Sequence, residues 1–277
     1  MSIQFGATVS FDTPKEFDII LQIEQYFPFM KYVEYRGERP FCFPGVTPQE
    51  KLDYYKSVLG KTSIRSTFHS TMYDINLATL NPWLKDANIA CYREFIDLAS
   101  DLGSEVLVVH GGHLNKDAKH TKRYEHFLEI AEANLCESLT ELADYGQPRG
   151  VKIAVENLPP TSEQLIIWNI ENHLKILNRV NHPNCGALFD MAHAFLHGLD
   201  VLDYLVKIRP HLFEIHAHNN MGELDDHQGL TNGKMDYLPI LQHADTHDVP
   251  FIMEIKSYEE VMQTLQWLKK LLQDGDI

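Results

Sequence analysis

The chain has 277 residues, of which 44% are hydrophobic, 10% aromatic and 23% charged, the composition of a globular protein with a sizeable core. Intrinsic disorder, collagen-like repeats and a small stapled scaffold are thereby excluded. The 24 Lys and Arg residues against 39 Asp and Glu residues give a net charge of −15, which disfavours general binding to nucleic acid or to an acidic membrane surface.

The cysteines and the first residues bear on the cellular compartment. The four cysteines are far apart and include no C-x-x-C pair typical of redox or thiolate-zinc sites, so we expect buried free thiols. The opening MSIQFGATVSFD lacks the basic and apolar regions of a signal peptide, and no window approaches about 18 consecutive apolar residues. We therefore expect a cytoplasmic protein with no membrane partner.

Eight short apolar, β-branched runs alternate with stretches of helical periodicity along the chain. The pairs Thr13-Pro14, Thr47-Pro48 and Asn81-Pro82 open the first three expected helices, and an apolar stripe predicts a fourth over Thr121–Tyr145. Eight βα units favour a single (β/α)₈ barrel over an open doubly wound sheet, because no G-x-G-x-x-G follows the first strand. We expect one domain over residues 1–277. The expected strands are Ile3–Val9, Lys31–Tyr35, Ser63–His69, Glu105–His110, Val151–Glu156, Gly186–Asp190, Leu212–His216 and Pro250–Ile255.

Residue types that bind metals end six of these strands. The carboxyl ends of barrel strands converge on one face, where active sites are built, so the six side chains would share one cavity. His, Asp and Glu make up 54 of the 277 residues, so eight positions chosen blindly would include only about one or two. The six residues are His69, His110, Glu156, Asp190, His216 and Glu254.

Two motifs add candidate ligands at the same face. His193 follows Asp190 in the turn FDMAH, and Asp225 and His227 form a D-x-H pair within the 19-residue loop Ala217–Met235. Taken singly, each residue has an ordinary alternative as a hydrogen-bonded histidine, a helix cap or a solvated loop residue. Several carboxylates buried together are costly without cations, and mixed carboxylate and imidazole ligands suit Zn²⁺, Mn²⁺ or Fe²⁺.

These motifs together resemble the xylose isomerase-like TIM-barrel superfamily, which includes sugar isomerases, sugar epimerases and endonuclease IV (AP endonuclease family 2). The resemblance covers nearly the whole chain and is specific as a set. The segments that carry it are His69–Tyr73, Val109–Gly112, Val155–Asn157, Phe189–His193, Ile215–Asn220, Asp225–His227 and Met253–Ile255.

The resemblance implies one to three divalent ions per chain. In the endonuclease-like pattern, Glu156 bridges the first two ions. The implied ligands are His69, His110 and Glu156 for the first ion, Glu156, Asp190, His216 and Glu254 for the second, and His193, Asp225 and His227 for the third. The epimerases with a single metal use the second set alone.

The sequence departs from the family pattern at two places. The opening Gly6–Ser10 resembles that of the endonucleases, but Thr8 stands where a histidine is usual there and the Gly-Gly that follows is missing, and Asn219 stands where an aspartate is common in both branches. These positions bear on DNA or substrate contacts more than on metal ligands.

The first functional hypothesis is a divalent-metal sugar or sugar phosphate isomerase or epimerase, whose expected partner is a small sugar. Glu156 and Glu254 would shuttle a proton next to a carbonyl, and His193 would orient or polarise a substrate oxygen. The basic stretch of Lys116, Lys119, Lys122 and Arg123 could hold a phosphate or simply be a solvated helix start. The expected substrate-binding residues are Tyr73, His218, Lys116 and Lys256.

Two alternatives remain open. Clustered zinc ions could hydrolyse the phosphodiester at abasic sites in DNA, which the full ligand set favours and the charge of −15 opposes. The protein could also be a non-catalytic metal-binding barrel, which would bind ions but convert no substrate. The aromatic segment Pro40–Pro44 could be a lid over the barrel mouth or an oligomer contact.

Overall fold

Eight parallel strands close into a barrel in a computed structural model of the chain, which describes residues 2–9 and 19–277. The order around the barrel is β1-β10-β9-β8-β6-β4-β3-β2, so the first and last strands pair with each other. The (β/α)₈ barrel is confirmed, and each expected strand is found within two residues of its expected bounds. The strands are β1 (Gln4–Val9), β2 (Met30–Arg36), β3 (Arg65–His69), β4 (Ser104–His110), β6 (Lys152–Glu156), β8 (Cys185–Asp190), β9 (Leu212–Ala217) and β10 (Pro250–Met253).

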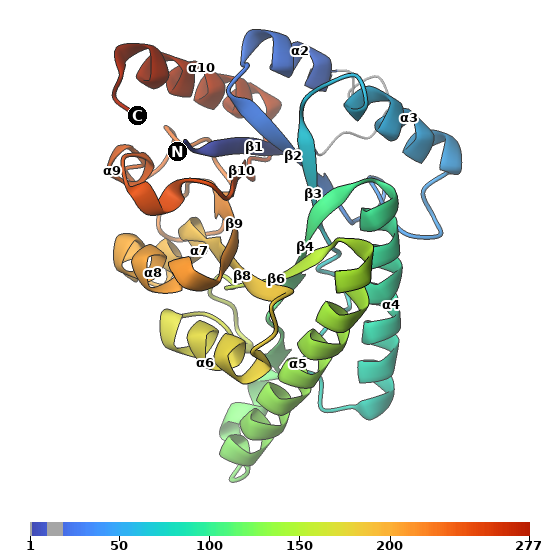
Figure 1. The fold of residues 1–277 in the computed structure, drawn as a ribbon. Coiled ribbons are helices and arrows are strands. Elements are labelled where there is room, and N and C mark those ends of the chain that lie inside the picture. Colours follow the sequence, from blue (N-terminus) through green and yellow to red (C-terminus); the bar gives the residue numbers. More distant parts are fainter. Residues whose placement is uncertain (1, 10–18) are drawn as a thin grey trace.

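Helices surround the strands on the outside of the barrel (Figure 1). Two of the expected Pro-containing starts are observed, since Pro48 precedes α3 and Asn81 caps α4 by accepting a hydrogen bond from the Trp83 amide. The pair Thr13-Pro14 lies outside the described residues. The helices are α2 (Ile19–Tyr26), α3 (Gln49–Leu59), α4 (Pro82–Asp101), α5 (Tyr124–Gly146), α6 (Ile170–Val180), α7 (Met191–Leu196), α8 (Val201–Ile208), α9 (Leu238–Leu241) and α10 (Tyr258–Asp274).

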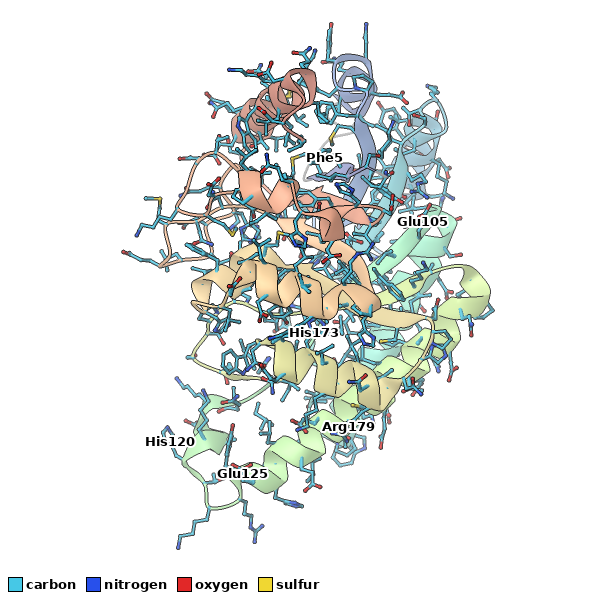
Figure 2. The ribbon with its side chains drawn as sticks, turned by 60° about the vertical axis from the view of Figure 1, so that its left-hand side comes forward. Phe5, Glu105, His120, Glu125, His173 and Arg179 are labelled. Atoms are coloured by element: carbon cyan, nitrogen blue, oxygen red, sulfur yellow. The ribbon has the colours of Figure 1, made fainter. Side chains whose placement is uncertain are left out.

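The basic stretch after β4 forms an excursion from the barrel. The short 3₁₀ helix η1 (Lys116–His120) precedes α5, which therefore begins three residues later than expected. A small antiparallel ladder of β5 (His113–Leu114) and β7 (Gln164–Leu165) ties the base of the excursion to the segment after β6. Figure 2 shows His120 and Glu125 at its projecting end.

The strands present alternate residues to two separate apolar environments. Leu107 and Val109 of β4 belong to the large core between the strands and the helices. Val106 and Val108 instead pack in a small cluster with Ala154 of β6 and with Leu188. This second set faces the barrel interior, because side chains alternate along a strand. The same alternation directs His110 and Glu156, two residues further along, into the mouth of the barrel.

All four cysteines are free, as expected; three of them are buried, whereas Cys91 is partly exposed. Within residues 2–9 and 19–277, no helix combines the length and the apolar character that crossing a bilayer requires.

Candidate metal centre and active site

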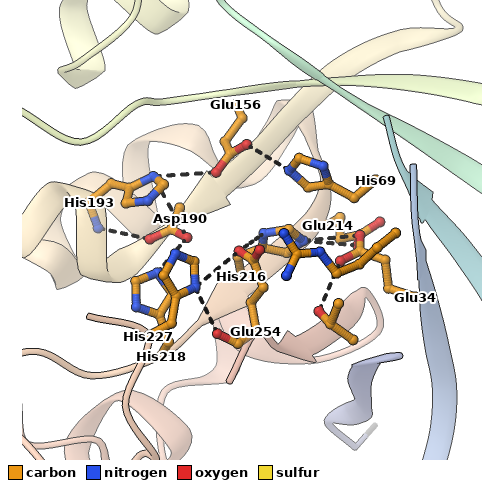
Figure 3. Close-up of polar contacts among 12 residues, drawn as sticks. Glu34, His69, Glu156, Asp190, His193, Glu214, His216, His218, His227 and Glu254 are labelled. Atoms are coloured by element: carbon orange, nitrogen blue, oxygen red, sulfur yellow. Dashed lines mark hydrogen bonds and ion pairs between the residues drawn. The ribbon is translucent and has the colours of Figure 1, made fainter. Parts of the chain in front are cut away.

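Five of the six predicted ligands at the strand ends lie in their strands, and Glu254 directly follows β10. The strand register places some of them at the same level, because His110 pairs with Glu156 and Asp190 pairs with His216. All but His110 are buried, which brings several carboxylates into a region with little water. Figure 3 shows the side chains of five of them, all but His110, converging on one region together with His193 of the β8–α7 turn and with His218 and His227 of the loop after β9.

The first group consists of His69, His110 and Glu156. Oε2 of Glu156 lies 3.2 Å from Nε2 of His110 and 3.5 Å from Nε2 of His69. Burial would lower the pKa of His69, but the adjacent Glu156 carboxylate and the other surrounding carboxylates raise it to about 9. One carboxylate oxygen therefore lies between two imidazoles, as a shared ligand atom would.

The second group surrounds His216 at the end of β9. Nδ1 of His216 lies 3.2 Å from Oε2 of Glu254, and donor atoms of Glu156, Asp190 and His216 lie within 4.8 Å of one another. Burial would raise the pKa of Glu156 and Glu254, but the neighbouring histidines hold both values well below the usual range. Both carboxylates are therefore ionised at neutral pH.

Asp190 has a second, local role at the start of α7. Its Oδ1 accepts a hydrogen bond of 2.8 Å from the backbone amide of His193, which caps the helix. Its Oδ2 remains directed toward the cluster and lies 3.2 Å from Nε2 of His218. The helix cap thus fixes the orientation of the carboxylate.

The third group centres on Asp225 in the loop after β9. Oδ2 of Asp225 lies 3.0 Å from Nε2 of His227 and 3.4 Å from Nε2 of His193. Burial opposes ionisation, but the two neighbouring histidines hold the pKa of Asp225 well below its usual range. His227 has a left-handed backbone with φ of 53°, a conformation uncommon for residues other than glycine and often found at functional sites.

Several buried donor and acceptor atoms in this region have no hydrogen-bond partner among the described residues. Such atoms cost free energy unless something else satisfies them. Their types, carboxylate oxygen and imidazole nitrogen, fit divalent Zn²⁺, Mn²⁺ or Fe²⁺. The atoms are Oε2 of Glu156, Nε2 of His193, Nδ1 of His216, Nδ1 of His218 and Oδ1 of Asp225.

Seven of the nine candidate ligands, all but Asp190 and His216, line a cavity of about 230 Å³ at the mouth of the barrel. Its walls also include apolar side chains, which restrict the access of water. The lining residues are His69, Met72, His110, Glu156, Leu158, Pro159, Thr161, His193, Asp225, His227 and Glu254.

The residues expected to contact substrate lie in different places. His218 is fully buried and stacks on His227 with ring centroids 4.0 Å apart, so it lies among the candidate ligands. Tyr73 is 66% exposed, and Lys116 lies in the excursion; neither is among the described residues that line the cavity. Nζ of Lys256 donates a 3.4 Å hydrogen bond to the carbonyl of Asp225, which places it near the rim.

The two residues that depart from the family pattern both make internal contacts. Oγ1 of Thr8 donates a hydrogen bond of 3.2 Å to Oε1 of Glu34. The Asn219 side chain donates to the carbonyls of Leu230 and Met235, both at 2.9 Å, and anchors the loop that carries Asp225. Both residues therefore support the structure from within, and their contacts with DNA or substrate stay a prediction.

Sequence reasoning missed a pair of carboxylates below the candidate ligands. Glu34 and Glu214 are fully buried, and both lie beside Nε2 of His216, at 3.1 Å and 3.5 Å respectively (Figure 3). Burial and the charge of Glu34 raise the pKa of Glu214 to about 8. The sequence pattern that could have identified Glu214 is its position inside an expected strand. Glu214 is two residues before His216 and therefore lies on the same face of the strand as that candidate ligand.

The chain is similar to proteins of several kinds. It is 25% identical to an uncharacterized protein of Methanocaldococcus jannaschii, over 81% of this chain and 75% of that protein. It is 27% identical to a probable endonuclease 4 of Thermoplasma acidophilum, over 66% and 63% of the two chains. It is 23% identical to a fructoselysine 3-epimerase of Shigella flexneri, over 73% and 71%.

The solved structures with similar folds include sugar epimerases. A D-tagatose 3-epimerase-like protein superposes with a TM-score of 0.80 at 20% identity, covering 98% of this chain and 97% of that one. The family model described as xylose isomerase-like TIM barrel matches residues 30–271. The chain therefore belongs to the xylose isomerase-like TIM-barrel family.

Proposed function

We propose that the protein is a divalent-metal-dependent isomerase or epimerase, which moves a proton at the carbon next to the carbonyl of a sugar or sugar phosphate. The observation that carries this proposal is the pair Glu156 and Glu254. Both carboxylates line the same cavity, and two strands, β8 and β9, separate the strands that present them. Two ionised carboxylates on different sides of one cavity can remove a proton from one face of a carbon and return it to the other.

The proposed metal ligands follow the groups that the fold brings together. Asp190 and His216 would hold an ion together with Glu156 and Glu254, and the two other groups provide room for up to two more. When bound, a divalent ion supplies a Lewis acid that makes the proton next to a carbonyl more acidic. The carbonyl and an adjacent hydroxyl of an open-chain sugar are suitable groups for this position.

The remaining residues would orient the substrate. His193 lines the cavity, and its Nε2 has no hydrogen-bond partner among the described residues, so it can donate to a substrate oxygen or join the third ligand group. Lys256 at the rim could approach a charged end of the substrate. The likeness to a fructoselysine 3-epimerase and to a D-tagatose 3-epimerase-like protein supports sugar chemistry for this cavity.

Exchange of the substrate proton with solvent tests this function. Protein loaded with Mn²⁺ or Zn²⁺ is incubated in D₂O with ketopentoses, ketohexoses and their phosphates, and NMR spectra are recorded. We expect one class to lose the signal of the proton next to the carbonyl and to gain signals of an epimer or isomer. Loaded protein that exchanges no such proton, in any of these sugars, would contradict the proposal.

A second candidate function is phosphodiester hydrolysis at abasic sites in DNA, as in endonuclease IV. The observation that favours it is the complete third ligand group, in which Asp225 lies between His193 and His227. An epimerase that uses a single ion does not need this third group. The net charge of −15 opposes it, because DNA contacts need a positive surface. Cleavage of a labelled duplex with a single abasic site at low salt would establish this alternative, whereas ion binding without either reaction would favour a non-catalytic barrel.

A further inference from the structure

His216 has its two ring nitrogens in different surroundings, although the whole residue is buried. Nε2 lies 3.1 Å from Oε2 of Glu34, with hydrogen-bond geometry. Nδ1 has no hydrogen-bond partner among the described residues and lies 3.2 Å from Oε2 of Glu254. A carboxylate accepts a hydrogen bond at Nε2, which leaves the Nδ1 lone pair free to bind an ion.

Glu34 is itself held in place by neighbouring strands. Thr8 on β1 and Thr67 on β3 are its register partners on either side. Oγ1 of Thr8 donates to Oε1 of Glu34 at 3.2 Å, so the two carboxylate oxygens have different partners. This arrangement directs the second oxygen, Oε2, toward His216.

Glu214 lies in the same layer but is placed differently. Its Oε1 accepts a hydrogen bond of 3.1 Å from Oγ1 of Thr67 and lies 3.5 Å from Nε2 of His216, farther than the 3.1 Å between Nε2 and Glu34. Glu214 is equally buried, so it provides a comparison for any effect of replacing a buried carboxyl group in this layer.

We propose that Glu34 is a positioning residue for the metal centre and that Thr8 supports it. Glu34 holds the proton of His216 on Nε2 and fixes the plane of the ring, so that Nδ1 is presented as a ligand beside Glu254. This inference rests on the metal-binding part of the proposed function and is independent of which substrate the cavity takes. Replacing a residue that hydrogen-bonds to a metal ligand typically weakens metal affinity 10- to 100-fold.

The test measures zinc binding without any substrate. Wild type, Glu34→Leu, Glu34→Gln, Thr8→Val and Glu214→Gln are titrated with Zn²⁺ in competition with a chromophoric chelator. We expect Glu34→Leu to weaken binding about 10- to 100-fold. Glu34→Gln should be affected less, since its amide oxygen can still accept from Nε2, and Thr8→Val and Glu214→Gln should lose less than Glu34→Leu.

A spectroscopic measurement separates positioning from general loss of structure. In zinc-loaded protein labelled with ¹⁵N-histidine, His216 should show a protected Nε2–H resonance and a metal-bound Nδ1. We expect this resonance to persist in Glu34→Gln and Glu214→Gln and to be lost in Glu34→Leu. If Glu34→Leu does not fold, the loss of affinity in Thr8→Val relative to wild type carries the test.

Three results would overturn the inference. The first is a wild type that binds no zinc. The second is equal weakening by Glu34→Leu and Glu214→Gln, which would indicate a general effect of the layer. The third is a wild-type His216 bound through Nε2. If zinc binding and the His216 resonance behave as expected but no sugar is turned over, the proposed reaction alone is contradicted.

Discussion

His110 and Glu156 are register partners on the neighbouring strands β4 and β6, and Nε2 of His110 lies 3.2 Å from Oε2 of Glu156. On its other side, Glu156 lies 3.3 Å from Nδ1 of His193, through Oε1. A single carboxylate therefore connects two of the ligand groups, one through each oxygen.

Replacing this carboxylate should have two effects at once. We expect Glu156→Gln to reduce turnover by at least about 100-fold, because it removes an acid–base group, and also to lower the metal content per chain. Turnover and elemental analysis of the same preparation provide the measurement. Glu132→Gln is the control, because Glu132 is a buried carboxylate that pairs with Lys175 and Arg179 outside the cavity lining. Unchanged activity in Glu156→Gln would remove Glu156 from the catalytic assignment.

Removing the ions should lower the thermal stability of the protein. An ion that binds only the folded chain stabilises it by about 2.7 kcal/mol at 100 times its Kd, so treatment with chelator should lower Tm and zinc should restore it. Mg²⁺ should restore less, because imidazole ligands favour zinc over magnesium. Thermal unfolding followed by calorimetry measures this shift. A Tm that is indifferent to chelator and zinc would indicate that the ligand groups hold no ion.

His173 should make the protein less stable in mild acid. Its ring is fully satisfied as the neutral form, since Nε2 donates to the Val155 carbonyl at 3.0 Å and Nδ1 accepts from Tyr204 at 2.9 Å. Burial lowers the pKa of His173 to about 3, whereas an unfolded histidine titrates near 6.5. The unfolded state therefore binds more protons between these values, and the free energy of unfolding falls as pH decreases.

The expected contribution of His173 to this loss is about 2 kcal/mol between pH 7 and pH 5. Urea unfolding at the two pH values, for wild type and His173→Gln, isolates it from the contribution of the carboxylates. The stability advantage of the wild type over the variant should shrink by that amount at pH 5. An advantage that stays constant with pH would show that His173 does not resist protonation.

Asn219→Asp should destabilise the protein by a few kcal/mol. The asparagine amide donates two hydrogen bonds to backbone carbonyls, and its oxygen accepts from the amides of Asn220 and Met235. An aspartate keeps the acceptor but loses both donors and places a charge against two carbonyls, each unsatisfied group costing about 1–3 kcal/mol. Urea unfolding measures the effect. Asn115→Asp is the control, since Asn115 caps η1 through its oxygen alone and should change stability little; similar losses in both variants would contradict this reading.

The sequence predicted the barrel because its strands are short, apolar and regularly spaced, and six of them end in ligand-type residues that a barrel must bring together. Glu34, Glu214 and Thr8 could not be assigned in this way, because their role depends on which strands are neighbours and on the register between them. His218 was expected to contact substrate but lies among the candidate ligands. Its position depends on the path of the loop after β9, which folds back through a bridge between Asn219 and Gln228. The start of α5 also shifted, because the residues before it form a 3₁₀ turn.

The hydrogen bonds of Asn219 also bear on the entropy of ligand binding. Ordering a flexible backbone costs about 1–2 kcal/mol per residue, and a loop that became ordered only around an ion would subtract that cost from the affinity. Here one side chain fastens the loop at Leu230 and Met235 without any ion or substrate. Asp225 and His227 are thus preorganised, so that most of the interaction energy of a ligand is available for affinity rather than for folding the loop.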